Sequence, residues 1–136
     1  MSKIFIPVLI LTILILAIFS LFVFNYFAVK RINEKLISFE LEGRTYLLKE
    51  ARNLKEWQKG LMNVLKPLSF NGMIFIFPDK EIRYFWNKNT FLDLDIYWLD
   101  DDKIVGKDFL PSITNSKEIV TKTSPLPVNK VVEIIK

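Results

Sequence analysis

The sequence of 136 residues contains neither cysteine nor histidine. Without cysteine the chain can form no disulfide, no thiolate nucleophile, no thiolate zinc site and no lipid anchor on a cysteine. Without histidine it also lacks the imidazole base of most serine and cysteine hydrolases, and every imidazole metal ligand. Carboxylate, lysine, tyrosine and hydroxyl groups are the chemistry that remains, and we expect neither a metal nor a cofactor.

Glycine and excess charge are also scarce. The chain has four glycines, and none lies in a loop of the kind that cradles phosphate groups, which argues against nucleotide binding. It has 19 basic and 15 acidic residues, a net charge of +4. Because these charges are spread along the chain, we expect no nucleic-acid partner. The acidic run Asp100–Asp102 is typical of a solvated hairpin turn, and we assign it no cation site.

One long apolar run lies at the N-terminus. Ile4–Phe24 carries no charge, and its 21 residues would span about 31 Å as a helix, enough for the hydrocarbon core of a bilayer. A cleaved signal peptide is the competing interpretation. However, the run is longer than the usual signal-peptide core of about 7 to 15 residues, and no small-x-small cleavage site follows it. We therefore predict a transmembrane anchor in residues 1–30 and one domain in residues 31–136.

Basic residues on the two sides of this run bear on its orientation. Lys30, Arg31 and Lys35 follow the run, whereas Lys3 alone precedes it. By the positive-inside rule, this distribution favours a cytoplasmic location for the C-terminal domain.

The pattern of residues 31–136 predicts mainly β-strands with one short helix. Asn53 and Glu56 match a capping box, and apolar residues then recur at helical spacing until Val64. Met73–Phe77 is apolar on both faces, as in a central strand, and Pro78–Lys80 is expected to turn the chain. Strands separated by turns predict an antiparallel β-sandwich or barrel-like domain. The other expected strands are Leu36–Leu41, Thr45–Lys49, Ile82–Lys88, Leu94–Leu99, Ile104–Phe109, Glu118–Thr121 and a last strand, Lys130–Ile135, that closes the sheet.

Five sequence blocks in this region carry a resemblance to a known family. They are EWQKGLM (Glu56–Met62), NGMIFIF (Asn71–Phe77), FWNKNT (Phe85–Thr90), LDIYWLD (Leu94–Asp100) and VVE (Val131–Glu133). Their order and spacing resemble those of DUF192, a family of small β-rich domains of undetermined function that often follow a signal peptide or membrane anchor. The resemblance implies a compact β-rich fold and an exported location, but no activity. We follow it in expecting the domain on the extracytoplasmic side of the cell membrane, against the positive-inside count.

Two residues depart from the pattern that the resemblance implies. Asn87 stands where the family usually has methionine, and Asp93 stands where it usually has proline. Both changes add polarity beside the central motif, so we expect a wetter pocket there than in relatives. The positions that match the family pattern are Gly60, Leu61, Met62, Gly72, Met73, Phe85, Trp86, Lys88, Asn89, Thr90, Leu94, Asp95 and Glu133.

The central motif FWNKNT allows a structural and a functional interpretation. In the structural one, Lys88 pairs with Asp95 while Asn89 and Thr90 bond the backbone of a turn. In the functional one, Trp86, Lys88, Asn89, Thr90 and Asp95 line a cleft for an anionic or sugar-like ligand. We expect structural roles for the remaining motif residues, which are Glu56, Gly60, Met62, Gly72, Met73, Phe85 and Glu133.

Two functions follow from these residues. The first is a non-catalytic, membrane-anchored envelope domain that binds a small ligand or a partner protein, and this is our prediction. The alternative is a cofactor-free hydrolase or lyase, in which two of the carboxylates of Glu56, Asp95 and Glu133 divide the acid and base roles. That alternative requires both carboxylates in one cavity, with Lys88 shifting the pKa of one of them.

Overall fold

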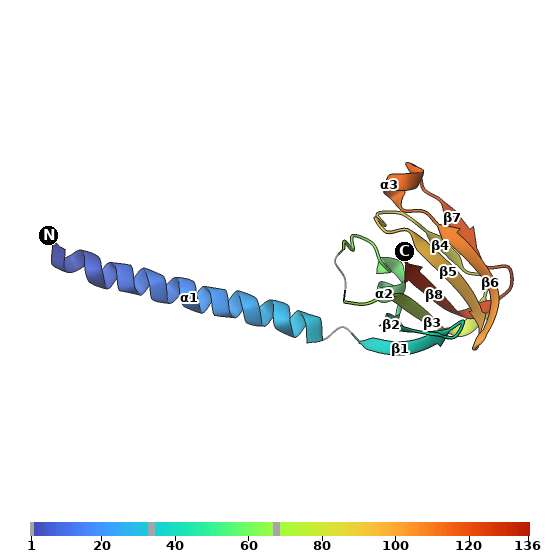
Figure 1. The fold of residues 1–136 in the computed structure, drawn as a ribbon, viewed down its shortest axis with the longest axis horizontal. Helices are drawn as coiled ribbons and strands as arrows, with labels where there is room; N and C mark the ends of the chain where they lie inside the picture. Colours follow the sequence, from blue (N-terminus) through green and yellow to red (C-terminus); the bar gives the residue numbers. More distant parts are fainter. Residues whose placement is uncertain (1, 33–34, 67–68) are drawn as a thin grey trace. The chain divides into compact units, whose positions relative to one another are not determined.

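The computed structural model describes residues 2–32, 35–66 and 69–136 (Figure 1). The chain divides into two units, Met1–Lys35 and Leu36–Lys136. The first unit contains a single helix, α1 (Ser2–Ile32). Within it, Val8–Tyr26 has a mean hydropathy of 2.8 over 19 residues, so by length and composition this helix is able to span a membrane. The predicted apolar N-terminal helix is therefore present.

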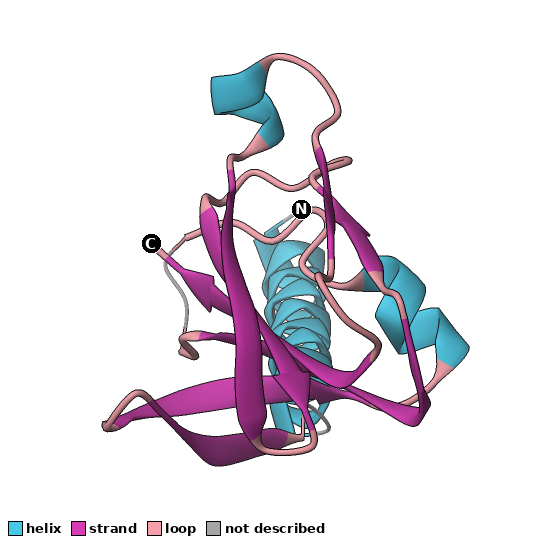
Figure 2. Ribbon diagram, turned by 90° about the vertical axis from the view of Figure 1, so that its right-hand side faces the viewer, coloured by secondary structure: helices cyan, strands magenta, loops and turns pink. Residues whose placement is uncertain are grey.

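The second unit is mainly β, as predicted. Its large sheet has six strands in the order β1-β2-β3-β8-β5-β6, with β1 and β6 as open edges, so the described residues form no closed barrel. Figure 2 shows how strongly these strands twist. The strands are β1 (Leu36–Leu41), β2 (Arg44–Ala51), β3 (Gly72–Glu81), β5 (Leu94–Asp100), β6 (Lys103–Leu110) and β8 (Val128–Ile135), and a separate ladder joins β4 (Tyr84–Trp86) to β7 (Thr121–Thr123).

One pair of neighbouring strands is parallel rather than antiparallel. β2 runs parallel to β3, whereas every other neighbouring pair in the large sheet is antiparallel. A parallel pair requires a crossover connection. Here the crossover contains the predicted short helix, α2 (Leu54–Lys59), which begins at the Asn53 cap. This helix ends earlier than predicted, because Gly60 takes a positive φ of 46° and turns the chain before Val64.

The last strand does not close an edge of the sheet. β8 lies between β3 and β5 in the middle of the sheet, with its pairing to each strand antiparallel. Its central place is explained by adjacent apolar residues on opposite faces, Val131 and Val132, which are both fully buried.

Three other local predictions were wrong. β3 continues through the turn expected at Pro78–Lys80, with an irregular register between Ile76 and Glu81. The strand expected at Ile82–Lys88 is reduced to the three residues of β4. The strand expected at Glu118–Thr121 is displaced to β7, and a short helix not foreseen from the sequence, α3 (Ile113–Ser116), precedes it.

The large sheet is apolar on both of its faces. One face, here called the site face, carries Phe75, Trp98 and Val131. The residues packed against it include Trp57 of α2 and Phe85 of β4. The opposite face carries a second cluster, which includes Leu41 and Leu48 of the β1–β2 hairpin together with Ile74, Tyr97 and Val132. The site face therefore lies beneath α2 and the β4–β7 ladder, and this arrangement positions the candidate site.

Candidate functional site

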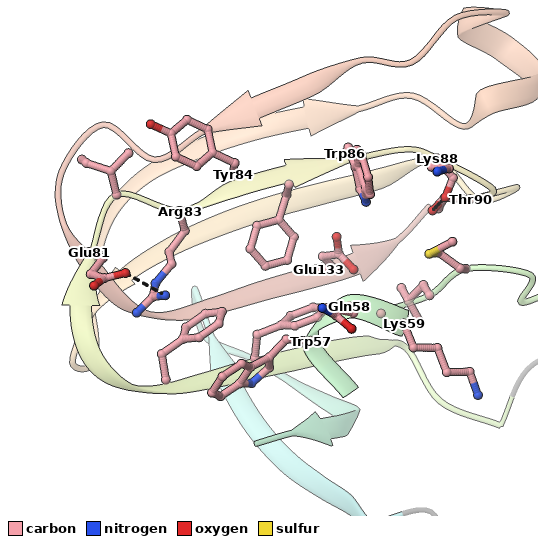
Figure 3. A pocket seen from close by; sticks show the side chains of 17 residues that line it. Trp57, Gln58, Lys59, Glu81, Arg83, Tyr84, Trp86, Lys88, Thr90 and Glu133 are labelled. Carbon is pink, nitrogen blue, oxygen red and sulfur yellow. Dashed lines mark hydrogen bonds and ion pairs between the residues drawn. The ribbon is translucent and has the colours of Figure 1, made fainter. Parts of the chain in front are cut away.

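A pocket of about 690 Å³ opens on the site face between α2 and β4 (Figure 3). Its lining comes from α2 and the turn that follows it, from β3, from the segment between Glu81 and Thr90, and from β8. Figure 3 shows Glu133 at the back of the pocket, between Trp86 and Lys88 on one side and Gln58 on the other.

Aromatic rings form the walls of this pocket. The rings of Trp57 and Phe77 lie 4.9 Å apart between their centroids. Phe85 packs edge-on against Phe75 at 4.8 Å, and this contact fixes β4 over the sheet. Because side chains alternate along a strand, the inward direction of Phe85 turns Trp86 outward, where it is 50% exposed at the mouth of the pocket.

Glu133 brings a carboxyl group into the apolar floor of the pocket. In the sheet its neighbours across the two adjacent strands are Met73 and Ile96, both buried and apolar. Glu133 itself is 4% exposed, and among the described residues no group donates a hydrogen bond to its carboxyl. Burial raises the pKa of this carboxyl to about 8, because no partner compensates the loss of water around the charged form.

Cationic side chains surround the mouth of the pocket. The Lys88 ammonium lies 5.2 Å from the centroid of the Trp86 ring, as expected for a cation–π contact. The Arg83 guanidinium lies 4.0 Å from the Phe77 ring. Arg83 also donates to the Asp79 carboxylate at 2.6 Å and lies 3.4 Å from the Glu81 carboxylate, so its charge is compensated locally.

The polar end of FWNKNT forms a turn whose fold depends on Asn87. Asn87 is fully buried, and its Nδ2 donates to the carbonyl of Pro111 at 2.9 Å and to Oγ of Ser116 at 2.8 Å. The Thr90 N–H donates to the Asn87 carbonyl, and Asn89 has a positive φ of 52°. Asparagine tolerates this left-handed conformation better than most residues. The motif thus combines a structural turn with residues that face the pocket.

Asn87 and Asp93, the two residues that depart from the family pattern, both form hydrogen bonds with the 111–120 segment. Asn87 contacts the 111–120 segment, and the Asp93 carboxylate accepts hydrogen bonds from the Ser112 N–H at 2.7 Å and from Asn115 Nδ2 at 2.8 Å. The bond from Ser112 lowers the pKa of Asp93. Neither residue lines the pocket on the site face, whereas Asp93 lines a second, smaller pocket together with Ser112 and Asn115. The expectation that the two residues add polarity to the pocket beside FWNKNT was therefore wrong for the site-face pocket, because their polar groups are directed at the α3 segment.

Asp95 does not join the pocket residues. It lies on the opposite face, between the site-face residues Leu94 and Ile96 of β5, and its carboxylate pairs with Lys136 at 3.4 Å. The predicted Lys88–Asp95 ion pair is therefore not formed. Of the five candidate ligand-binding residues, Trp86, Lys88 and Thr90 line the pocket, whereas Asn89 and Asp95 do not.

Several residues expected to be structural have identifiable roles. Glu56 accepts a hydrogen bond from the Arg52 N–H at 2.7 Å and completes the N-terminal cap of α2. Position 72 requires glycine because the backbone of β8 passes close to it: a Cβ there would lie 1.8 Å from the Glu133 carbonyl oxygen. Met73 is buried in the core, whereas Gly60 and Met62 line the pocket.

The sequence analysis missed several of the residues that line the pocket. Trp57, Arg83 and Tyr84 contribute to it. Glu133 had been expected to be structural, or in the catalytic alternative to be one of two acids, and its place as a lone carboxylate within the apolar run VVEII was a signal of an unusual site. Among the described residues, no group of three acidic side chains is arranged to hold a metal ion.

The comparison with protein families identifies the domain. The family model of DUF192, described as an "Uncharacterized ACR", matches residues 37–136. The chain therefore belongs to the DUF192 family, a family of unknown function, and the predicted resemblance is confirmed. No curated protein is significantly similar to the chain.

Two crystal structures have a similar fold. A candidate transcription regulator from Sinorhizobium meliloti 1021 is 28% identical, with a TM-score of 0.57 over 75% of this chain and 79% of that chain. A protein of unknown function from Novosphingobium aromaticivorans DSM 12444 is 20% identical, with a TM-score of 0.57 over 76% of this chain and 82% of that chain. Both similarities support the mainly β fold.

Proposed function

We propose that this protein is a membrane-anchored, non-catalytic binding domain that takes a small ligand into the pocket between α2 and β4. The observation that carries the proposal is the pocket itself, which combines aromatic walls with polar side chains such as Lys88, Thr90 and Glu133. Its volume of about 690 Å³ lies within the usual range of ligand pockets, about 300 to 1,000 Å³. The combination of apolar walls with a few convergent polar groups is typical of sites that bind small molecules.

The positions of the carboxylates favour binding over catalysis. The hydrolase or lyase alternative needs two of Glu56, Asp95 and Glu133 in one cavity, and only Glu133 lines this one. Glu56 is engaged at the cap of α2, and Asp95 lies on the opposite face with Lys136. The other carboxylate that lines the pocket, Glu81, is exposed and lies 3.4 Å from the Arg83 guanidinium, so it is paired rather than set opposite Glu133 as a second catalytic acid.

We place the domain on the extracytoplasmic side of the cell membrane, anchored by α1. Because the chain has no cysteine, single cysteines can report this orientation. A membrane-impermeant maleimide should label Ser38→Cys in intact spheroplasts, because Ser38 is exposed on β1. The matched variant Ser2→Cys should be labelled only after lysis, and the reverse pattern would place the domain in the cytoplasm.

The binding proposal can be tested with the indole N–H signals of the three tryptophans. Trp57 and Trp86 line the pocket, whereas Trp98 is fully buried and its Nε1 donates to Asp108. The full chain, labelled with ¹⁵N and held in lipid nanodiscs, is titrated with small neutral, anionic and cationic ring compounds. We expect the Trp57 and Trp86 signals to shift while the Trp98 signal stays in place.

A matched pair of variants distinguishes ligand binding in the pocket from nonspecific stacking of the ligand on any exposed aromatic ring. Trp86 and Phe109 are 50% and 46% exposed, and each ring has a lysine ammonium 5.2 Å from its centroid. Only Trp86 belongs to the pocket. Trp86→Ala should weaken binding about tenfold, the loss of a stacking contact, and Phe109→Ala should leave it unchanged. The proposal fails if no compound shifts Trp57 and Trp86 ahead of Trp98.

A further inference from the structure

We propose that Glu133 is the recognition residue of this pocket, and that it binds an uncharged ring ligand through an adjacent hydrogen-bond donor and acceptor. This inference rests on the proposed function and names the class of ligand. It starts from a group whose hydrogen-bonding capacity is unused. Glu133 lines the pocket, is 4% exposed, and receives no hydrogen bond from any described residue. Because buried polar groups in folded proteins are nearly always paired, the partner of this carboxyl comes from the pocket, as water or as a group of a bound ligand that displaces it.

The surroundings of Glu133 favour its neutral form. Met73 and Ile96 lie beside it on the neighbouring strands, and both are buried. The charged groups that line the pocket from other elements are Lys59 at the end of α2, Glu81 and Arg83 at and just after the end of β3, and Lys88 after β4, while Tyr84 adds a phenol. Burial is the cause that raises the pKa of the Glu133 carboxyl to about 8. The site therefore favours the neutral carboxylic acid form of Glu133 at neutral pH.

A carboxylic acid offers a specific hydrogen-bonding pattern. Its O–H is a donor and its carbonyl oxygen is an acceptor, and the two lie side by side. The complementary ligand presents an adjacent acceptor and donor, as a primary amide, a cyclic amide or a pair of neighbouring hydroxyls on a sugar does. Aromatic walls complement the flat or apolar face of a ring that carries these groups.

Charge at the mouth of the pocket argues against ionic ligands. A cationic ligand would meet a lining that carries Lys59, Arg83 and Lys88 against one exposed carboxylate, Glu81. An anionic ligand would be attracted to Lys88, but its charge would lose water at the apolar floor and would gain no opposite charge from neutral Glu133. An uncharged ligand meets neither cost.

Two matched sets of ring compounds test this inference. Benzamide, benzoate and benzylamine share a flat aromatic ring and differ in charge, and D-glucose, D-glucuronate and D-glucosamine do the same on a sugar ring. Each is titrated into the full chain in lipid nanodiscs at pH 6.5, with the Trp57 and Trp86 indole signals as the readout. We expect the neutral member to bind at least about tenfold more tightly than its charged relatives, and the set in which this occurs identifies an amide or a sugar ligand.

Substitutions of Glu133 add a second, independent readout. Glu133→Gln keeps an adjacent donor and acceptor, so binding of the neutral compound should be retained and should no longer depend on pH. Glu133→Leu introduces an apolar side chain that has neither a hydrogen-bond donor nor an acceptor, so the affinity for the neutral compound should fall about tenfold. In the unchanged chain, binding should weaken as the pH rises above about 8, because ionisation of Glu133 removes its donor. The Trp98 signal should report an intact core in every variant.

The outcomes distinguish this inference from the proposed function. If charged members shift Trp57 and Trp86 at least as readily as neutral ones, or if Glu133→Leu binds as well as the unchanged chain, the pocket binds ligands but Glu133 does not select them. If no member of either set shifts Trp57 and Trp86, both the inference and the proposed function are overturned. Retention with Glu133→Gln and loss with Glu133→Leu support the inference.

Discussion

Asn87 and Val120 are joined by two hydrogen bonds that continue the β4–β7 ladder. The backbone N–H of Asn87 donates to the Val120 carbonyl at 3.1 Å, and the Val120 N–H donates to the Asn87 Oδ1 at 2.8 Å. The side-chain oxygen thus takes the place of a backbone carbonyl just beyond the last paired residue, Trp86. This pairing fixes the point at which the chain turns from β4 toward the pocket residues Lys88 and Thr90.

Replacement of Asn87 should therefore destabilise the domain strongly. Asn87→Leu has a similar volume but leaves the Val120 N–H and the Ser116 hydroxyl without their buried partner. We expect a loss of about 3 kcal/mol in the free energy of unfolding, measured by urea denaturation. Asn89→Gly is the control, because Asn89 is exposed with a φ of 52° that glycine adopts freely, and it should change little. Equal effects of the two substitutions would contradict the assigned role of Asn87.

Ionisation of Glu133 should make the domain less stable as the pH rises. Its pKa is about 8 in the folded chain and 4.5 as the reference value, so the folded state holds a proton that the unfolded state releases between these values. Stability from this group is therefore greatest below about pH 4.5, falls as the pH rises to about 8, and levels off at higher pH. The total loss is on the order of a few kcal/mol.

Glu133→Gln should remove this pH dependence, since the amide does not titrate. Urea denaturation at pH 5, 7 and 9 should show similar stability for the two proteins at pH 5 and a clear advantage for Glu133→Gln at pH 9. The pKa values of Asp93 and Asp101 are lowered, so these two groups change the stability only in more acidic solution and do not contribute to a difference between pH 5 and pH 9. A flat profile for the unchanged chain would show that the carboxyl is solvated.

A methyl group at position 72 should disrupt the centre of the sheet. The Cβ of Gly72→Ala would lie 1.8 Å from the carbonyl oxygen of Glu133, which is backbone and cannot rotate away. We expect a loss of at least about 3 kcal/mol, seen as a large drop in the thermal unfolding midpoint. Gly43→Ala is the matched control, because Gly43 has a φ of 75° but no atom within 4 Å of the added carbon. It should cost about 1 to 2 kcal/mol, the strain of the left-handed conformation alone.

Lys88→Ala and Asp95→Ala should have small effects on stability. Lys88 is exposed and contacts Trp86 through a cation–π interaction worth about 0.5 to 1 kcal/mol. Asp95 pairs with Lys136, whose side chain is 52% exposed, and such pairs contribute about 0.2 to 1 kcal/mol. Thermal unfolding of each variant tests this expectation. A loss of about 3 kcal/mol or more in either one would instead indicate a buried, mutually dependent pair.

Local sequence patterns were sufficient for part of the candidate site. Trp86 was expected to line a cleft, and it does lie at the mouth of the pocket, because alternation along β4 directs it away from the inward-facing Phe85. Asn89 was expected to line the same cleft but does not, because the chain turns after Trp86 and Asn89 adopts a left-handed conformation. Asp95 was assigned to the site from its place in the motif, but it lies on the opposite face from Leu94 and Ile96.

The sequence by itself determined the apolar helix α1, the β1–β2 hairpin and the cap of α2, because each depends on residues close together in the chain. Tertiary structure alone decided that β8 enters between β3 and β5, and hence that Glu133 meets the aromatic residues of α2 and β4. Strand order in a sheet results from contacts between distant segments, which no local periodicity encodes. The same non-local packing places Glu133, a single carboxylate in an apolar run, on the lining of a pocket without a hydrogen-bond donor from the described residues.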